Sequence, residues 1–437
     1  MSSMQLVCVA CKALYSVEEI RYRCECGEIL EVQRNDWEEI KKQVTKKVLK
    51  DRQGSYEFPY NSGVWRYHEL ILPVEKKYIV SKPEGNTNLY FVGTESEQGY
   101  KKIGEYVGVE RLFLKHEGEN PTGSFKDRGM TCGMTQAKVI GAKAVACAST
   151  GNTSASLASY ASQAGIPGFV FIPDGKISMS KLSQTIAYGA TTLQVKGDFD
   201  VAMKLVQEIA EKMGIYLLNS INPFRIEGQK SITYELLQQL DWEVPDWLVL
   251  PGGNLGNTSA AGKALLELKE LGFIKKIPRI AVIQAHGANP FFQSYTNGFK
   301  DKISVKASTI ASAINIGAPV SHTKAVRVIH ESNGIVEEVA DEELLNAKAI
   351  VDRVGIGCEP GSATTVAGIK KLIEKGIIKS NETVAGYLTA HVLKDPDTTN
   401  MYHQNMLEGI HPMMRNEIIQ VDATLDSVQR IIEKYIK

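Results

Sequence analysis

Short apolar runs alternate with longer helical segments from about residue 110 to residue 390, and this alternation restricts the fold more than any other feature of the chain. Each run has the length and the apolar, β-branched composition of a buried strand. Strands that are separated by helices usually pair in parallel, because no tight hairpin can join them. The pattern predicts an α/β protein with strands at residues 111–117, 143–149, 168–173, 191–195, 216–219, 247–253, 279–285, 334–339 and 383–389.

The strands fall into two series, which predict two open, mostly parallel wound sheets with an active site in the cleft between them. We expect residues 110–219 to form a small α/β domain and residues 220–437 to form a large one. Residues 36–109 are expected to pack on the large domain, after a separate segment at residues 1–35. Residues 424–436 carry apolar side chains on one helical face, which predicts a C-terminal helix that docks on the body.

Composition excludes several classes of partner. The 437 residues include 50 basic and 50 acidic side chains, so the formal net charge is zero. Nucleic acid and anionic membranes attract proteins with an excess of Lys and Arg, so neither partner is expected. No apolar stretch reaches the ~18 residues that span a bilayer, and the first residues lack the pattern of a signal or transit peptide. Seven cysteines without an export signal indicate reduced thiols, and we expect a cytoplasmic protein.

Four of the cysteines lie close together near the N-terminus. Cys8 and Cys11 form a C-x2-C pair, and Cys24 and Cys26 follow twelve residues later as C-x-C. Four thiolates from two turns can hold zinc tetrahedrally, so the spacing predicts a structural zinc ribbon. The second pair departs from the usual C-x2-C, and a metal-free ribbon folded against the main body is the alternative. Apolar or helical surroundings predict buried, unreactive thiols at Cys132, Cys147 and Cys358.

The run GENPTGSFKDRGM, residues 118–130, contains the lysine that is best placed for covalent chemistry. Lys126 follows a predicted strand and lies just inside a predicted helix whose expected N-cap is Ser124. A lysine forms a Schiff base at neutral pH when burial or a positive field lowers the pKa of its amine. The positive end of a helix supplies part of such a field. The alternative for this Lys-Asp-Arg triplet is a solvated helix face with an ion pair.

Two other strand ends carry polar, glycine-rich loops that open helices. Residues 149–154 read STGNTS, and hydroxyl and N–H groups at a helix start suit a carboxylate or a phosphate. A capped helix with a serine-rich first turn is the alternative for this loop. Residues 250–257 read LPGGNLGN, where glycines let backbone amides converge on a phosphate. Neither GxxxxGK[ST] nor GxGxxG is present there, so an ATP P-loop and a dinucleotide site are not supported.

Together, these motifs resemble the successive signatures of the threonine synthase family, in its plant and archaeal branch. The likeness runs nearly from end to end, and it includes the cysteine ribbon and WRYHELILP at residues 65–73. The motifs PTGSFKDRG and STGNTSAS are shared with related dehydratases and synthases. NPFRIEGQK at residues 222–230 and the LKDP tail at residues 393–396 are more specific to threonine synthases. The resemblance rests on PTGSFKDRG, STGNTSAS, NPFRIEGQK at 222–230, LPGGNLGN, ASAINIGAPVS at 311–321 and LTAHVLKDPD at 388–397.

The resemblance implies a pyridoxal phosphate enzyme with the fold of tryptophan synthase β, a lyase that makes L-threonine and phosphate from O-phospho-L-homoserine and water. Lys126 would hold the cofactor as a Schiff base and then act as acid and base. Asn152 would pair with the ring hydroxyl, Thr389 would meet the pyridine nitrogen, and the cofactor phosphate would bind Gly252, Gly253, Asn254, Leu255, Gly256 and Asn257. The substrate would bind Ser149, Thr150, Asn152, Thr153, Asn219, Arg225 and Asn254.

Arg225 is the most persuasive of these residues chemically, because a guanidinium offers planar paired donors to phosphate oxygens. Outside its motif, a surface or ion-paired arginine would be the simpler interpretation. Val392 departs from the family, which commonly has glycine there, and its bulk can reshape the edge of the cofactor site. His391 beside it is expected to be structural, since Lys126 already supplies the base.

Other functions remain open on the sequence. The nearest alternative is another pyridoxal phosphate enzyme on the same scaffold, such as a serine/threonine dehydratase or a sulfur synthase that uses phosphoserine. A binding protein whose ribbon contacts nucleic acid belongs to a different class, and the neutral charge and intact lysine motif count against it. The resemblance also implies a homodimer.

Overall fold

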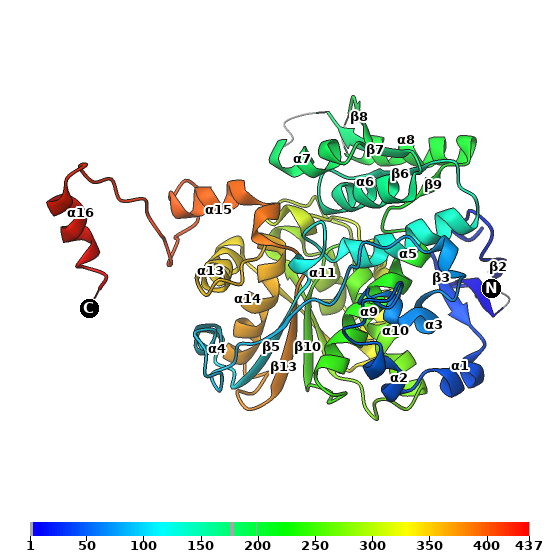
Figure 1. Cartoon of the computed structure of the whole chain (residues 1–437), viewed down its shortest axis with the longest axis horizontal. Helices are drawn as coiled ribbons and strands as arrows, with labels where there is room; N and C mark the ends of the chain where they lie inside the picture. Colours follow the sequence, from blue (N-terminus) through cyan, green and yellow to red (C-terminus); the bar gives the residue numbers. More distant parts are fainter. Residues whose placement is uncertain (1–2, 175–178, 198, 437) are drawn as a thin grey trace.

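The computed structural model describes residues 3–174, 179–197 and 199–436, so the outermost ends of the expected terminal domains lie outside the described residues. These residues form three sheets, of three, six and four strands (Figure 1). Within them, no helix combines the length and the apolar character that crossing a membrane requires.

The six-stranded sheet is parallel except at one edge, where β4 runs antiparallel to β5. Side chains alternate between its two faces, as the period of two in a strand requires. In β10, Leu248 and Leu250 enter one core cluster, whereas Trp247 and Val249 enter the other. The strand order is β12 (Ile335–Val339), β11 (Arg279–Ala285), β10 (Trp247–Pro251), β13 (Thr383–Leu388), β5 (Arg111–His116) and β4 (Leu89–Phe91).

Helices cover both faces of this sheet, which explains why its central strands β10, β11 and β13 are mainly apolar. One face packs with α9 (Pro223–Gln239), α10 (Gly256–Glu270) and α12 (His322–Glu331). The other packs with α4 (Lys101–Val107), α13 (Asp341–Arg353) and α14 (Pro360–Glu374). The short helix α11 (Pro290–Thr296) follows β11.

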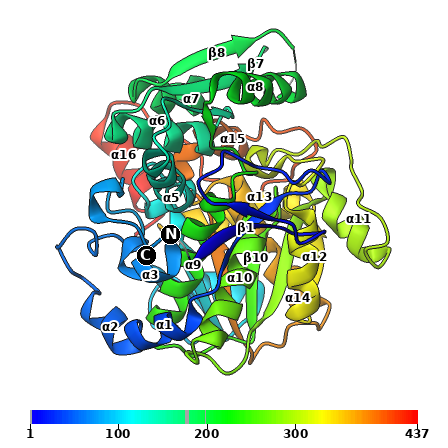
Figure 2. The same ribbon diagram turned by 90° about the vertical axis from the view of Figure 1, so that its right-hand side faces the viewer.

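The four-stranded sheet is parallel throughout, in the order β8 (Thr191–Val195), β7 (Gly168–Pro173), β6 (Val145–Ala148) and β9 (Tyr216–Leu217). Its face toward the rest of the molecule packs with α5 (Lys126–Val139), α6 (Asn152–Ala164) and α7 (Met179–Ala187) (Figure 2). The opposite face packs with α8 (Phe199–Met213) and with Val9 and Ile29 from the N-terminal segment.

All nine expected strands are present, but β5 does not pair with β6, β7 or β8, the strands that come next along the chain. It pairs in parallel with β13, from Arg111 opposite Thr383 to His116 opposite Leu388. From β5 in the six-stranded sheet, the chain therefore crosses to the four-stranded sheet through α5 and returns through α9. A strand buried on both faces has no pattern that reveals its neighbour, so apolar runs alone could not indicate this assignment.

The N-terminal part supplies both a small sheet and a large share of the core. Strands β1 (Met4–Cys8), β2 (Leu14–Ser16) and β3 (Leu30–Arg34) pair antiparallel. Trp65 and Tyr67 are fully buried against α9, and Trp65 Nε1 donates a hydrogen bond of 2.8 Å to Thr131 on α5. The helices of this part are α1 (Trp37–Gln43), α2 (Lys46–Asp51), α3 (His68–Ile71) and the 3-10 turns η1 (Trp65–Tyr67) and η2 (Lys76–Tyr78).

A buried ionic cluster joins α5, α9 and the N-terminal part. Arg128 on α5 bonds Glu117 at 2.6 Å and Glu235 on α9 at 2.8 Å, with all three side chains inaccessible to solvent. Glu235 also accepts from Lys115 at 2.6 Å and from Arg66 at 2.7 Å. Glu117 begins the 3-10 turn η3 (Glu117–Glu119) that follows β5. The cluster therefore connects α5 and α9 with the end of β5, the turn η3 and the N-terminal part.

The C-terminal helix does not dock on the body as expected. After α15 (Pro396–His403) the chain extends away from the sheets, and α16 (Leu425–Ile432) lies clear of them (Figure 1). No residue of α16 is buried, and Leu425 is 79% exposed. Periodicity identified the apolar face correctly, but it carries no information about what covers that face.

Replacing Arg128 with Met should lower the free energy of unfolding by about 3–5 kcal/mol, because Glu117 and Glu235 lose a buried counter-charge. Urea unfolding followed by fluorescence measures this loss. Arg21→Met is the control, since its ion pair with Glu19 is partly exposed to solvent and should contribute less than about 1 kcal/mol. Equal effects of the two substitutions would contradict the role given to the cluster.

Candidate active site

Lys126 is the first residue of α5, at the point where the chain leaves the six-stranded sheet. The preceding loop is tied to the end of β13: Phe125 N donates to Thr389 O at 2.9 Å, and Ser124 forms an isolated bridge with Ala390. Phe125, not Ser124, occupies the N-cap position, and no side chain caps the helix. Ser124 Oγ instead accepts from Lys126 N at 3.4 Å, because the bridge to Ala390 holds Ser124 in the extended connection.

The surroundings of Lys126 favour a neutral amine. Burial, reinforced by the positive charge of Arg225, lowers the pKa of Lys126 to about 7, and the negative charge of Glu359 opposes this shift. Its Nζ lies 4.2 Å from the centre of the Phe125 ring. A much larger fraction of this lysine is therefore an unprotonated nucleophile at neutral pH than of an ordinary lysine. The alternative of a solvated helix face is wrong for this residue.

Asn152 opens α6 directly after the loop that follows β6. Its Nδ2 donates to Glu359 Oε2 at 3.0 Å, and Glu359 comes from the start of α14 in the six-stranded unit. Gly151 stands at the N-cap without a side-chain cap bond, so a conventional serine-capped helix does not explain the STGNTS loop. Among the other predicted residues of this loop, Ser149 and Thr150 are partly exposed and Thr153 is buried.

The glycine-rich loop joins β10 to α10 in an unusual backbone conformation. Leu255 adopts a left-handed conformation with φ of 62°, and the first N–H groups of α10 have no partner inside the helix. A Cβ on Gly252 would lie 2.7 Å from Val282 Cγ1, so a side chain cannot be accepted there without displacement. The buried Asn257 Oδ1 lacks a hydrogen-bond partner among the described residues. The free N–H groups at the start of α10 thus give the predicted run from Gly252 to Asn257 donors that an anion can satisfy, whereas the Asn257 oxygen is an acceptor and needs a donor.

Arg225 lies in the first turn of α9 and is almost fully buried. Nη1 donates to Leu218 O at 2.9 Å, while Nε and Nη2 find no partner among the described residues. Burial lowers the pKa of Arg225 to about 10. Leaving charged donors buried and unpaired is costly, so the site fits an anionic ligand. The interpretation as a surface arginine is therefore wrong.

Asn219 and Asn254 hold the loops on either side of Arg225. The Asn219 side chain donates to Ala148 O at 2.9 Å and accepts from Ala148 N at 3.0 Å, which extends the pairing of β9 with β6. One Nδ2 hydrogen of Asn219 remains after these bonds. Asn254 O accepts from Ser321 N at 3.1 Å. Each loop is thus fixed where its strand ends.

Thr389 follows β13, and its hydroxyl pairs with Ser362 Oγ at 2.9 Å. Ser362 lies in the first turn of α14, three residues after Glu359. His391 Nδ1 accepts from Leu393 N at 3.2 Å, and its ring stacks on His116 at a centroid distance of 6.0 Å. These contacts agree with a structural role for His391.

Two residues near the site were missed by the sequence analysis. Glu359 and Ser362 belong to the run CEPGSA, which follows no strand and therefore lay outside the search for loops at strand ends. The available signal was a carboxylate directly before a proline at a helix start, where it often caps the helix. Val392 lies against Gly357, since a Cβ on that glycine would be 3.0 Å from Val392 Cγ1.

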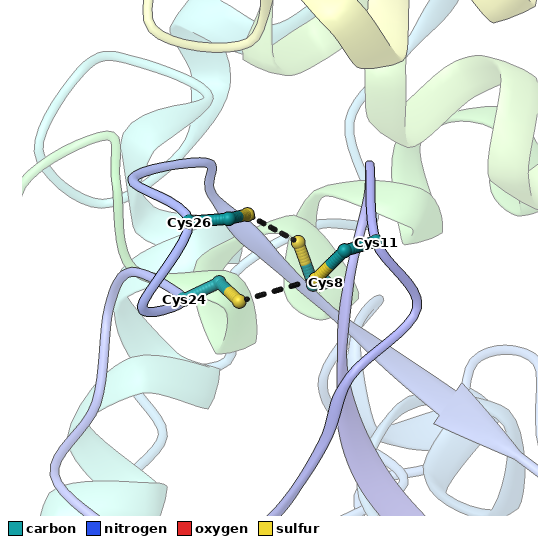
Figure 3. A group of neighbouring side chains, drawn as sticks. All are labelled: Cys8, Cys11, Cys24 and Cys26. Carbon is teal, nitrogen blue, oxygen red and sulfur yellow. Dashed lines mark hydrogen bonds between the residues drawn. The ribbon is translucent and has the colours of Figure 1, made fainter.

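The four N-terminal cysteines converge as their spacing predicts (Figure 3). Their sulfur atoms all lie within 4.8 Å of one another, with Cys8 and Cys26 3.5 Å apart and Cys11 and Cys24 3.4 Å apart. Zinc bound to four thiolates at about 2.3 Å places sulfur atoms about 3.8 Å apart, so the donor set fits that ion. The other cysteines are buried, and burial raises the pKa of Cys132, Cys147 and Cys358.

A family model described as "Pyridoxal-phosphate dependent enzyme" matches residues 80–390. The chain is 46% identical to the threonine synthase of Methanocaldococcus jannaschii over 392 residues, which are 89% of this chain and 93% of that protein. The chain belongs to the threonine synthase family. It is also 40% identical to threonine synthase 2, chloroplastic, of Arabidopsis thaliana, over 97% of this chain and 83% of that one. Its activity is accordingly that of a pyridoxal-phosphate dependent threonine synthase.

Solved structures confirm the fold expected from the resemblance. Processed threonine deaminase isoform 2 of Solanum lycopersicum superposes with a TM-score of 0.63, at 20% identity over 79% of this chain and 94% of that one. Maize serine racemase gives a TM-score of 0.61 at 21% identity, over 79% of this chain and 97% of that one. Members of the threonine synthase family thus share this scaffold with proteins of other names.

Replacing Arg225 with Met should raise the pKa of Lys126, because it removes a positive charge that disfavours the ammonium form. In cofactor-free protein, the midpoint for labelling the Lys126 peptide with an amine reagent should move to higher pH. Mass spectrometry across a pH series measures it. Arg279→Met is the control. Arg279 is the first residue of β11, at the end of the strand opposite the active site, so this substitution should leave the midpoint unchanged. An unmoved midpoint in the Arg225 variant would refute the electrostatic coupling.

Proposed function

We propose that this member of the threonine synthase family converts O-phospho-L-homoserine and water to L-threonine and phosphate, with the residues predicted from its motifs. The observation that carries the proposal is Arg225, a buried guanidinium that acts electrostatically on Lys126 and has two donor nitrogens without a partner among the described residues. Such a group suits the phosphate of the substrate, which the protein must bind apart from the cofactor phosphate.

Pyridoxal phosphate would be attached to Lys126 and, when bound, supplies the electron sink that stabilises negative charge on a substrate carbon. The amide of Asn152 would meet its ring oxygen, and the hydroxyl of Thr389 its pyridine nitrogen. A neutral hydroxyl does not enforce protonation of that nitrogen as a carboxylate would. The backbone from Gly252 to Asn257 would hold the cofactor phosphate at the start of α10.

Lys126 would move the protons of the reaction. An amine with a pKa of about 7 takes up and returns protons readily at neutral pH. It would remove protons from Cα and Cβ of the substrate and return protons to Cγ and Cα. Phosphate leaves from Cγ, and water supplies the hydroxyl at Cβ and the proton that the phosphate takes. Donors at Ser149, Thr150, Thr153, Asn219, Arg225 and Asn254 would stabilise the departing charge.

We also propose that Cys8, Cys11, Cys24 and Cys26 hold a structural zinc ion. The short sulfur–sulfur distances support it. A cytoplasmic location is supported by the free state of all seven cysteines, although one relative is named as chloroplastic. A homodimer would give the uncovered apolar face of α16 a surface to bury against.

Purified protein should release phosphate and threonine in equal amounts from O-phospho-L-homoserine in a coupled steady-state assay. Arg225→Ala should raise KM by roughly 30-fold or more, since losing charge-assisted bonds costs at least ~2 kcal/mol. Cofactor content should stay near that of the unchanged protein, and Arg279→Ala should behave normally. Formation of 2-oxobutyrate from threonine as the main activity would instead identify a dehydratase.

Zinc should co-purify at one ion per chain, as measured by plasma mass spectrometry. Cys11→Ser, which removes one of four ligands, should abolish this content and lower the melting temperature by several degrees. Cys358→Ser, at a buried cysteine far along the chain, is the control and should retain the metal. Full metal content in the Cys11 variant would rule out the four-thiolate site.

A further inference from the structure

Glu359 occupies a position from which its side chain would be expected to cap α14, yet it does not. Pro360 is the first residue of the helix, and Glu359 stands at the N-cap without a side-chain cap bond. Its backbone N donates to Ala390 O at 3.1 Å, which fixes it beside the loop that follows β13. The side chain is 5% exposed and reaches Asn152 Nδ2 at 3.0 Å. The carboxylate therefore serves another loop, not its own helix.

The bond to Asn152 fixes the orientation of that amide. An ionised carboxylate accepts hydrogen bonds and cannot donate them, so the nitrogen of Asn152, not its oxygen, must face Glu359. One hydrogen of Nδ2 is used in this bond, and the second remains available as a donor. A side-chain amide without such a partner could turn by 180° and present its oxygen instead. The Asn152 amide can donate to an anionic oxygen on the cofactor ring only in the orientation in which its nitrogen, not its oxygen, faces Glu359.

Charged groups from several elements face the Glu359 carboxylate. Lys126 comes from α5, while Lys394 and Asp395 come from the segment after β13, and their charges act on it together with the hydrogen bond from Asn152. Burial raises the pKa of Glu359, and Asn152, Lys394 and Lys126 counteract that shift. In turn, Glu359 supplies the negative charge that opposes Arg225 at Lys126.

We propose that Glu359 is a positioning residue of this active site, which fixes the Asn152 amide as a donor toward the cofactor ring. The negative charge of the same carboxylate also acts on Lys126 and favours the ammonium form of that lysine. The inference rests on the proposed function insofar as Asn152 and Lys126 hold the cofactor. It adds to that function a residue that bonds the Asn152 amide, acts on Lys126 through its charge, and binds neither substrate nor cofactor itself.

The first test concerns Lys126 in cofactor-free protein. Glu359→Gln keeps the size of the side chain and removes its charge, so the midpoint for labelling the Lys126 peptide should move to lower pH. Label uptake at pH 6 should rise severalfold. Glu359→Asp keeps the charge and should leave the midpoint close to that of the unchanged protein. Glu382→Gln is the matched control, since Glu382 accepts from Trp247 Nε1 at 3.1 Å just before β13, at the end opposite Thr389.

The second test concerns orientation of the ring in cofactor-loaded protein. Glu359→Gln and Glu359→Asp should both shift the absorption spectrum of bound pyridoxal phosphate, because neither holds the Asn152 amide in one orientation at the same distance. In an Asn152→Ala background, the spectral effect of Glu359→Gln should disappear while its effect on Lys126 labelling persists. Circular dichroism melting of each variant identifies any that fails to fold, and Glu359→Asp then serves in place of Glu359→Gln for the spectral comparison.

The proposal is overturned if Glu359→Gln matches Glu382→Gln in both the labelling midpoint and the cofactor spectrum. It is also overturned if the spectral effect survives unchanged without the Asn152 amide. Neither readout uses phosphohomoserine, so a protein that makes no threonine still tests Glu359. Conversely, normal labelling and spectra in the Glu359 variants would overturn the role of Glu359, while the unchanged protein could still make threonine. The two proposals can therefore fail separately.

Discussion

The contact of Arg128 with Glu117 and Glu235 is the constraint on which the geometry of the active site depends. Arg128 lies two residues after Lys126 on α5, and Glu235 lies ten residues after Arg225 on α9. The ionic cluster therefore sets the distance between the helix that carries Lys126 and the helix that carries Arg225. Because the charges are buried, removing one partner costs far more than an exposed ion pair would.

The chemistry of Lys126 follows from opposing effects that this framework holds in place. Burial and Arg225 disfavour the ammonium form, whereas Glu359 favours it, and the result is a pKa of about 7. A substrate phosphate bound at Arg225 would neutralise the repulsive charge. Binding at the phosphate site and the proton state of the lysine are thus coupled electrostatically.

The sequence indicated the strands and their loops because buried strands and glycine-rich turns leave strong local signals. It could not place β5 with β13, since pairing depends on residues far apart in the chain. It also erred at Ser124, where a bridge to Ala390 outweighed the local capping preference, and at α16, whose apolar face is uncovered. Glu359 was missed because its role depends on Asn152, 207 residues earlier.

For the candidate site, the residue types were predictable and their partners were not. The motif around Arg225 indicated an anion site, but only the folded chain reveals two donor nitrogens that no group in the described part of the chain pairs with. Asn219 was chosen as a ligand from its motif, and its pairing with both polar groups of the Ala148 backbone depends on the register of β9 with β6.

The buried ionic cluster also determines where this protein can be divided. The segment shared with the wider family of pyridoxal-phosphate dependent enzymes begins at residue 80, whereas Trp65 and Arg66 come before it and reach into α5 and α9. A fragment that starts at the family boundary would lose those contacts and leave Glu235 with fewer counter-charges. The catalytic core of this chain is therefore not a transferable module. A fragment that keeps the contacts of Trp65 must begin before residue 62, because Ser62 Oγ accepts a hydrogen bond of 3.2 Å from Trp65 N.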